Sequence, residues 1–167
     1  MSLDPSSVRL TPDTLEPGAL LTAFCANRVE IGAVVSFTGL MRAEQGTATA
    51  LELDAYPGFT EAAILQKVEV ATRRFDLQDV LIVHRIGMVA PGDPIVFVAA
   101  AAAHRRGAFE GADFLMDYLK SRAPFWKKSH EPDGARWIEP TARDYEDAAR
   151  WDELHVEEGA CPKRMPE

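Results

Sequence analysis

The sequence predicts a single domain of the α+β class. Apolar stripes typical of amphipathic helices are interspersed with β-rich runs, but strands and helices do not alternate in the regular way of a doubly wound sheet. The 167 residues suit one domain with a core of its own. No internal repeat or linker divides the chain, so we expect one domain over residues 1–156 and a frayed tail over 157–167.

The first half of the chain contains two predicted helices and two predicted strands. Residues 15–27 carry an apolar stripe at helical spacing, and residues 31–38 are rich in β-formers. Residues 49–56 alternate between apolar and polar side chains, as a strand with one solvated face does. A second helix begins at Thr60 after a Pro-Gly turn. Its apolar stripe consists of Ile64, Val68, Ala71 and Phe75.

The second half continues the mixed pattern. Its predicted elements are a buried strand (80–86), a turn-rich connection (87–94), a strand (95–103), the clearest helix (108–122), a short segment (137–138) and an acidic helix (145–154). The five alanines that end the strand over 95–103 have no strand preference, so its end is ambiguous. Pro124 stops the clearest helix, and we interpret Phe125 and Trp126 as a plug of the core.

The composition argues against several classes of protein. Acidic side chains number 26 against 18 Lys and Arg, and the net charge of −8 disfavours non-specific binding to nucleic acid. The longest apolar run, residues 95–103, is too short to span a membrane. Cys25 and Cys161 form no metal or redox motif, and the first residues lack the features of a secretory signal. We therefore expect a cytoplasmic protein.

The signatures of several common enzyme classes are absent from the sequence. It has no Gly-rich phosphate loop, no Gly-x-Ser-x-Gly, no His-Glu-x-x-His and no paired-cysteine motif. The four histidines share no metal-binding spacing. We therefore expect no metal site and no P-loop.

Basic residues at the ends of predicted elements are the candidate functional groups. Residues 104–128 contain six Lys and Arg against three acids. Each alone has an ordinary explanation: Lys120, for example, suits the last turn of a helix and could pair with Asp117. Together they could form a pocket for a small anion, in which a lysine crowded by cations has a lowered pKa. The candidates are Arg42, His104, Arg105, Lys120, Lys127 and Lys128.

Several of these residues lie in motifs that follow one another from Ile31 to Trp137. The motifs are GAVVSFTG at 32–39, YPG at 56–58, HRIG at 84–87, PGD at 91–93, AHR at 103–105 and MDYLKSRAPFWKK at 116–128. In this order they resemble the MoaE family, the large, catalytic subunit of molybdopterin synthase. The resemblance implies a fold of the α/β-hammerhead type with a small antiparallel β subdomain.

The resemblance also implies a sulfurtransferase of molybdenum cofactor biosynthesis. Such an enzyme converts cyclic pyranopterin monophosphate (precursor Z) to molybdopterin by adding the two sulfurs of its dithiolene. Sulfur arrives as a thiocarboxylate on the C-terminal Gly-Gly tail of a small ubiquitin-like partner subunit. The large subunit is a homodimer within a heterotetramer. Preorganised cations would stabilise the anionic reactants, so we expect no cofactor, and we expect neither nucleic acid nor membrane as a partner.

Carried over position by position, the resemblance gives roles to individual residues. Lys120 and Lys127 match the two active-site lysines, which would be catalytic through proton transfer. Basic residues near them would hold the phosphate of the pterin. The substrate-binding residues would be Leu40, Met41, Arg42, His104, Arg105, Lys120, Lys127, Lys128 and Ser129.

Two features depart from the family pattern. The loop over residues 43–49 is shorter than is common in the family. The difference affects the contacts that this loop would make with substrate or partner, and it does not affect the lysines. An arginine that reaches the neighbouring subunit's pocket in the family would here be Arg143, displaced behind Pro140, Thr141 and Ala142.

Two other functions are compatible with the residues. One is a binding module that docks a ubiquitin-like protein without catalysis, although docking alone would not require both lysines and the His104-Arg105 pair. The other is a hydrolase of phosphate ligands that uses the same cationic pocket. It would form product without any sulfur donor.

Overall fold

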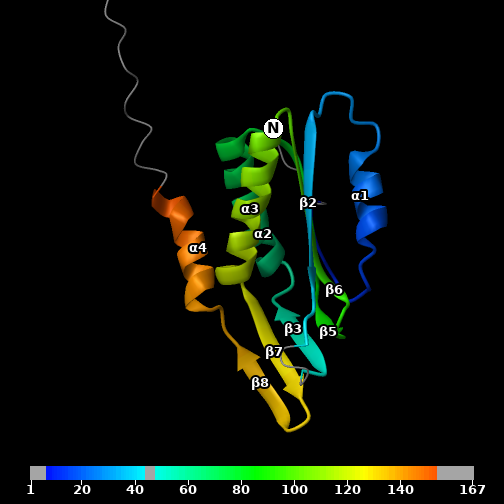
Figure 1. The fold of residues 1–167 in the computed structure, drawn as a ribbon, viewed down its shortest axis with the longest axis vertical. Helices are drawn as coiled ribbons and strands as arrows, with labels where there is room; N and C mark the ends of the chain where they lie inside the picture. Colours follow the sequence, from blue (N-terminus) through cyan, green and yellow to red (C-terminus); the bar gives the residue numbers. More distant parts are fainter. Residues whose placement is uncertain (1–6, 44–47, 154–167) are drawn as a thin grey trace, which may run out of the picture.

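The computed structural model describes residues 7–43 and 48–153, which contain four helices and eight strands (Figure 1). In chain order these are β1 (Val8–Thr11), α1 (Pro17–Cys25), β2 (Ala33–Leu40), β3 (Ala50–Ala55), α2 (Phe59–Phe75), β4 (Leu77–Arg85), β5 (Gly87–Val89), β6 (Pro94–Ala102), α3 (Arg105–Ser121), β7 (Phe125–Glu131), β8 (Gly134–Ile138) and α4 (Ala142–Glu153). The predicted tail over 157–167 and the predicted end of the last helix at Leu154 lie outside the described residues.

The strands form two four-stranded sheets. The first has the order β1-β4-β6-β2 and is mixed, because β1 runs parallel to β4 while the other pairs are antiparallel. The second has the order β5-β3-β7-β8 and is antiparallel throughout. The two sheets and the four helices confirm the predicted α+β class. The second sheet is the small antiparallel β subdomain that the resemblance implies.

Helices cover both faces of the first sheet. Figure 1 shows α2 and α3 on one side and α1 on the other. Ile64 of α2 and Leu115 of α3 are fully buried in one cluster with Val98 of β6. Phe24 of α1 packs with Phe97 in a second cluster on the opposite face. The remaining helix, α4, lies beside α3 and adds Trp151 to the first cluster.

The alanine-rich end of the predicted strand belongs to β6. Ala100 and Ala102 face α2 and α3, whereas Ala99 and Ala101 face α1. All four are buried, because helices cover both faces of this strand. Small side chains here let the helices approach the sheet closely. Packing between elements therefore decides this strand, rather than the β-propensity of its residues.

Several strands have no clear pattern in the sequence. The sequence does not predict β1, β5 or β7, and β8 is longer than the short segment expected at 137–138. The strand β7 mixes charged and aromatic residues without apolar alternation. It is held in place by pairing on both sides, with β3 and with β8. Trp126 of β7 is 42% exposed, which corrects the expectation that it plugs the core.

Candidate active site

A cavity of about 390 Å³ lies where the end of α3 meets the second sheet. Basic side chains from α3, β7, β8 and the segment after β2 line it together with apolar residues. The lining residues are Leu40, Met41, Arg42, Ala48, Leu51, Leu53, Ile95, Lys120, Lys127, Ser129, Arg136 and Ile138. The cavity thus brings together six of the predicted site residues, including both predicted catalytic lysines.

The alternation of side chains along β7 decides which of its residues reach the cavity. Lys127 and Ser129 lie on the cavity face of the sheet. Lys128 points to the other face, where its Nζ lies 3.8 Å from Glu52 Oε2 and 4.6 Å from the centre of the Trp137 ring. Lys128 therefore lies outside the cavity, although it is adjacent to Lys127 in sequence.

Lys120, in the last turn of α3, does not form the ion pair with Asp117 that its spacing allows. The Asp117 carboxylate instead faces α4. Arg150 Nη2 donates to Asp117 Oδ2 at 2.7 Å, and Trp151 Nε1 donates to the same oxygen at 2.6 Å. These contacts attach α4 to α3. Lys120 thus contributes its charge to the cavity rather than to its own helix.

Burial and charge lower the pKa of Lys127. Burial, followed by the positive charge of Lys120, brings it to about 8, while the charge of Asp144 acts in the opposite direction. About a tenth of Lys127 is therefore neutral at pH 7.

Asp144 lies in the first turn of α4. The backbone N–H and the hydroxyl of Thr141 each donate to its carboxylate at 2.7 Å. Burial raises the pKa of Asp144, but these hydrogen bonds and the charges of Lys120 and Lys127 outweigh it and hold the pKa below the usual range. Asp144 is thus an anion that acts on both cavity lysines.

The segment after β2 is fixed by backbone hydrogen bonds to a turn of the chain. Met41 N donates to the carbonyl oxygen of Asp93 at 2.8 Å, and Gly92 N donates to the carbonyl oxygen of Met41 at 2.8 Å. Met41 is buried by this arrangement. Arg42, the next residue, lines the cavity from this fixed segment.

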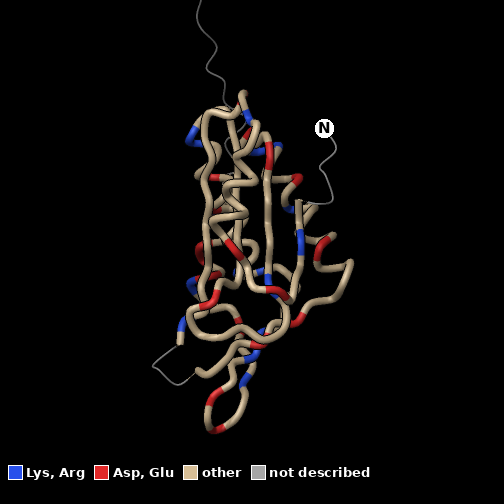
Figure 2. Tube along the Cα trace, turned by 90° about the vertical axis from the view of Figure 1, so that its right-hand side faces the viewer, with Lys and Arg blue, Asp and Glu red and all other residues tan. Residues whose placement is uncertain are grey.

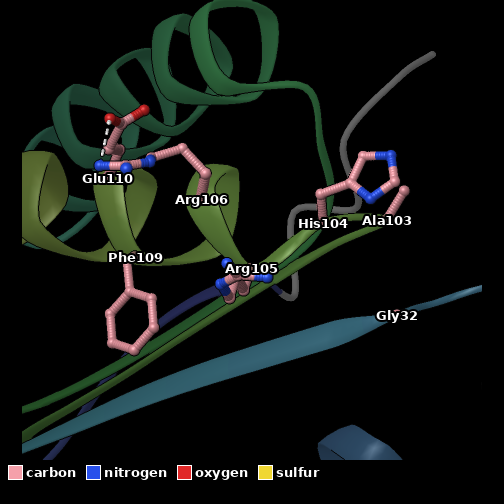
Figure 3. Close-up of a pocket in the computed structure, with 7 residues that line it drawn as sticks. All are labelled: Gly32, Ala103, His104, Arg105, Arg106, Phe109 and Glu110. Carbon is pink, nitrogen blue, oxygen red and sulfur yellow. Dashed lines mark ion pairs between the residues drawn. The ribbon is translucent and has the colours of Figure 1, made fainter.

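His104 and Arg105 lie at the opposite end of α3 from Lys120. The 17 residues of this helix span about 25 Å. A separate hollow of about 760 Å³ is found there, lined by both residues (Figure 3). In Figure 3, Phe109 projects from the side of the helix opposite to the Arg106–Glu110 ion pair. One chain therefore does not bring His104 and Arg105 to the cavity lysines.

The fold separates the basic residues that are concentrated between positions 104 and 128 in the sequence. Acidic and basic residues are interspersed over the whole molecule (Figure 2). Three of the six basic residues have carboxylate partners: Arg106 pairs with Glu110, Arg122 with Asp152, and Lys128 with Glu52. Of the six, Lys120 and Lys127 line the cavity.

Arg143 lies in α4 and is exposed. Its Nε is 3.9 Å from a carboxylate oxygen of Asp147, one turn further along the helix. It does not line the cavity of its own chain.

Sequence reasoning missed two residues near the lysines. Arg136 lines the cavity from β8, and only the pairing of β8 with β7 could have shown this. His84 of β4 is buried and stacks on Phe125, with ring centres 4.1 Å apart. Its Nδ1 is 2.7 Å from the carbonyl oxygen of Arg85, so Nδ1 carries the proton. Burial lowers the pKa of His84 to about 4; the hydrogen bond with the Arg85 carbonyl acts against this shift, and the charge of Lys127 acts with it.

The arrangement suits the binding of anions. Cations surround a partly apolar cavity, in which electrostatic attraction is stronger than in water. No group of three His, Cys, Asp or Glu side chains that could hold a metal ion occurs in residues 7–43 and 48–153. Among the same residues, no helix is long and apolar enough to cross a membrane.

Comparison with known proteins decides the family. The family described as MoaE protein matches residues 10–122. The molybdopterin synthase catalytic subunit of Caulobacter vibrioides is 68% identical over 146 residues, which cover 87% of this chain and 97% of that protein. The chain belongs to the MoaE family. Its function is that of the catalytic subunit of molybdopterin synthase, an enzyme of molybdenum cofactor biosynthesis.

Solved structures agree with this MoaE assignment. The MoaE protein of Burkholderia ambifaria has a TM-score of 0.75 and 42% identity, and the match covers 88% of this chain and 98% of that one. A protein–protein complex of subunits 1 and 2 of Molybdopterin-converting factor from Helicobacter pylori matches with a TM-score of 0.67. This match covers 82% of this chain and 92% of that one at 21% identity, and it shows the shared fold.

Proposed function

We propose that the cavity around Lys120 and Lys127 is where this MoaE chain converts cyclic pyranopterin monophosphate to molybdopterin. The observation that carries the proposal is that two lysines share one cavity and that one of them has a pKa of about 8. The cyclic phosphate and the thiocarboxylate sulfur donor are both anions. Bringing them together requires several cations at one place.

The residues of the cavity divide the work as follows. Lys127 exchanges protons near neutral pH while the cyclic phosphate opens and water is lost. Lys120 stabilises negative charge on the reacting groups. Arg42 binds the phosphate, with Leu40, Met41 and Ser129 as the walls beside it. Lys128 faces away and is paired with Glu52, so we assign it no contact with substrate.

The sulfur donor is the thiocarboxylated C-terminus of a small ubiquitin-like partner subunit. Each transfer forms one carbon–sulfur bond to the pterin and breaks one at the donor. Oxygen from water replaces that sulfur, and the donor is left as a carboxylate. The Helicobacter pylori relative, solved as a complex of two subunits, supports a two-subunit enzyme.

We further propose that two copies of the chain form a dimer that completes each site. A groove of about 670 Å³ follows α3 from Arg106 to Lys120 beside β2, the edge strand of the first sheet. Phe37 and Phe109 are exposed along it. If α3 of a second copy ran antiparallel in this groove, its N-terminal end would lie beside Lys120 of the first copy. His104 and Arg105 of the second copy would then reach the phosphate.

Two smaller expectations belong to the same proposal. In such a dimer Arg143, exposed on α4, is the candidate for contact with the neighbouring site. A cytoplasmic location is supported by Cys25, an exposed free thiol. The expected tail over 157–167, like Cys161, lies outside the described residues.

A single-turnover reaction tests the proposed function. It combines the purified chain, its thiocarboxylated small subunit and cyclic pyranopterin monophosphate, with the dithiolene product quantified. Lys120→Ala should reduce the rate by roughly 100-fold or more and leave binding of the small subunit nearly intact. Lys128→Ala is the matched control, with a rate within a few-fold of the unchanged chain.

The other outcomes distinguish the alternatives. A stable complex without any dithiolene would favour the docking module. Opening of the cyclic phosphate in the absence of a sulfur donor would favour the hydrolase. Normal turnover by Lys120→Ala would remove the lysine from the mechanism.

A further inference from the structure

The two lysines of the cavity are joined by a short turn. Helix α3, which carries Lys120, and strand β7, which carries Lys127, are separated by residues 122–124 alone. Figure 1 shows α3 leading directly into β7. Phe125 N donates to the carbonyl oxygen of Ala123 at 2.8 Å, which makes the turn tight. The position of Lys127 relative to Lys120 therefore depends on how this turn is held.

A buried hydroxyl from another helix holds this turn. Thr60 lies in the first turn of α2 and is fully buried. Its Oγ1 donates to the carbonyl oxygen of Pro124 at 3.1 Å and accepts a hydrogen bond from Tyr56 N at 3.0 Å. Pro124 directly precedes β7, and Tyr56 directly follows β3. One hydroxyl, which can both donate and accept, thus ties together the ends of two neighbouring strands.

The tie lies at the end of the strand pair that carries Lys127. The strands β3 and β7 pair antiparallel, with Ala55 opposite Phe125 and Leu53 opposite Lys127. Successive residues of a strand face opposite sides of the sheet. A slip of one residue would therefore turn Lys127 away from the cavity, to the side on which Lys128 lies. A hydrogen-bonded tie at the end of the pair opposes such a slip.

We propose that Thr60 is a positioning residue of the lysine pair: its hydroxyl fixes the start of β7 and so sets the place of Lys127 relative to Lys120. This inference rests on the proposed function, because the reaction requires both lysines at one place. Thr60 does not line the cavity, so its effect passes through Pro124 and the backbone of β7. A hydroxyl with a merely structural role would change the stability of the chain without changing the behaviour of Lys127.

The charge state of Lys127 reports its position. The titratable and charged groups around it are Lys120 of α3, Asp144 of α4, Arg136 of β8, the buried His84 of β4, and Arg42 after β2. Burial and the charge of Lys120 are the two causes that lower the pKa of Lys127 to about 8. A displacement of β7 that exposes Lys127 and separates it from Lys120 would therefore raise this pKa.

Labelling of Lys127 with an amine-specific acylating reagent is the first test, because it requires no turnover. Thr60→Val removes the hydroxyl at nearly constant size, and Thr60→Ser keeps it. The pH of half-maximal labelling should rise by roughly half a unit or more in Thr60→Val and stay in place in Thr60→Ser. Thr60→Cys, whose thiol forms weaker hydrogen bonds, should lie between them, and it serves the test if Thr60→Val does not fold. Midpoints equal to that of the unchanged chain in Thr60→Val and Thr60→Cys would overturn the inference.

Val68→Ala is the matched control for lost stability. Val68 is fully buried on the same helix, and its truncation destabilises the core without removing a hydrogen bond to the turn. Urea unfolding should show reduced stability in both Val68→Ala and Thr60→Val, whereas the labelling midpoint should move in Thr60→Val only. A shift of equal size in Val68→Ala would overturn the inference, since the midpoint would then follow stability rather than the hydroxyl.

Single-turnover sulfur transfer tests the consequence for the reaction. With the small subunit and the pterin both saturating, Thr60→Val should react roughly tenfold more slowly, while its affinity for the small subunit stays unchanged. Thr60→Ser and Val68→Ala should react at nearly the normal rate. Equal rates of Thr60→Val and Thr60→Ser would overturn the inference. Absence of dithiolene with the unchanged chain would instead contradict the proposed function, and the labelling midpoints would still decide whether Thr60 positions Lys127.

Discussion

Lys120 and Lys127 place two positive charges in one cavity, and after burial the charge of Lys120 is the main cause that lowers the pKa of Lys127 to about 8. The two residues belong to different elements, the last turn of α3 and the strand β7. Their proximity is therefore a property of the fold. It gives the site one amine, that of Lys127, that can exchange protons near neutral pH.

This relationship predicts how Lys127 reacts with an amine-specific acylating reagent. Labelling requires the neutral amine, so it should rise with pH and reach half its maximum at about pH 8. Lys120→Met removes the repelling charge, which makes protonation of Lys127 easier and should move the midpoint upward by roughly half a pH unit or more. Lys120→Arg keeps the charge and should leave the midpoint in place. Identical midpoints in all three proteins would contradict the coupling. Mass spectrometry of the labelled peptide provides the measurement.

The proposed dimer predicts complementation between two inactive variants. Lys120→Ala and Arg105→Ala damage different parts of the proposed site, which lie about 22 Å apart along α3 in one chain. If each site combines Lys120 of one copy with Arg105 of the other, a mixed dimer contains one intact site. Random mixing should then restore about a quarter of the normal activity.

The control for this experiment is a mixture of two preparations of Lys120→Ala, which should remain inactive. Lack of any recovery, although the subunits exchange, would show that Lys120 and Arg105 do not combine across two copies.

The buried His84 predicts a loss of stability at acid pH. Its pKa is about 4 in the folded protein against 6.5 ordinarily, so between these values the unfolded chain binds a proton that the folded chain does not. The contribution is complete above pH 6.5 and should decrease by roughly 3 kcal/mol as the pH falls to 4. His84→Phe keeps a ring against Phe125 and removes the titration. Urea unfolding at several pH values should show the difference, and parallel curves for the two proteins would contradict it.

The attachment of α4 predicts a measurable effect on stability. Asp117→Ala leaves Arg150 and Trp151 without their shared acceptor and should lower the free energy of unfolding by roughly 2 kcal/mol. Glu110→Ala, on the same helix, breaks only the exposed pair with Arg106 and should change it by less than about 0.5 kcal/mol. Urea unfolding at pH 7 provides the comparison. Similar values for the two variants would mean that the Asp117 contacts do not hold α4 in place.

The parts of the fold with regular apolar spacing are predictable from the sequence. The stripe that includes Ile64 and Val68 is buried in α2 as expected, and the clearest predicted helix corresponds to α3 although it begins at Arg105. The strand β7 could not be predicted in this way, because its pairing with β3 and β8 decides it rather than its own residues.

The candidate site shows the same limit. The sequence places Lys120 in the last turn of the clearest helix and Lys127 in the segment after Pro124, and the structure has them there. The two lysines share a cavity. The sequence does not show that Lys128 faces away from Lys127, nor that Arg136 joins it, because both facts follow from the register of β7. In the proposed dimer, a second copy of the chain supplies His104 and Arg105, which the sequence does not show. That depends on surfaces between molecules.

The wall of the lysine cavity draws on residues from Leu40 to Ile138, almost the whole length that the structure describes. The strands β7 and β8 follow β6 and α3 in the chain and supply Lys127, Ser129, Arg136 and Ile138 to that wall. A chain that ends before Phe125 would therefore retain all four strands of the first sheet and lack one side of the cavity.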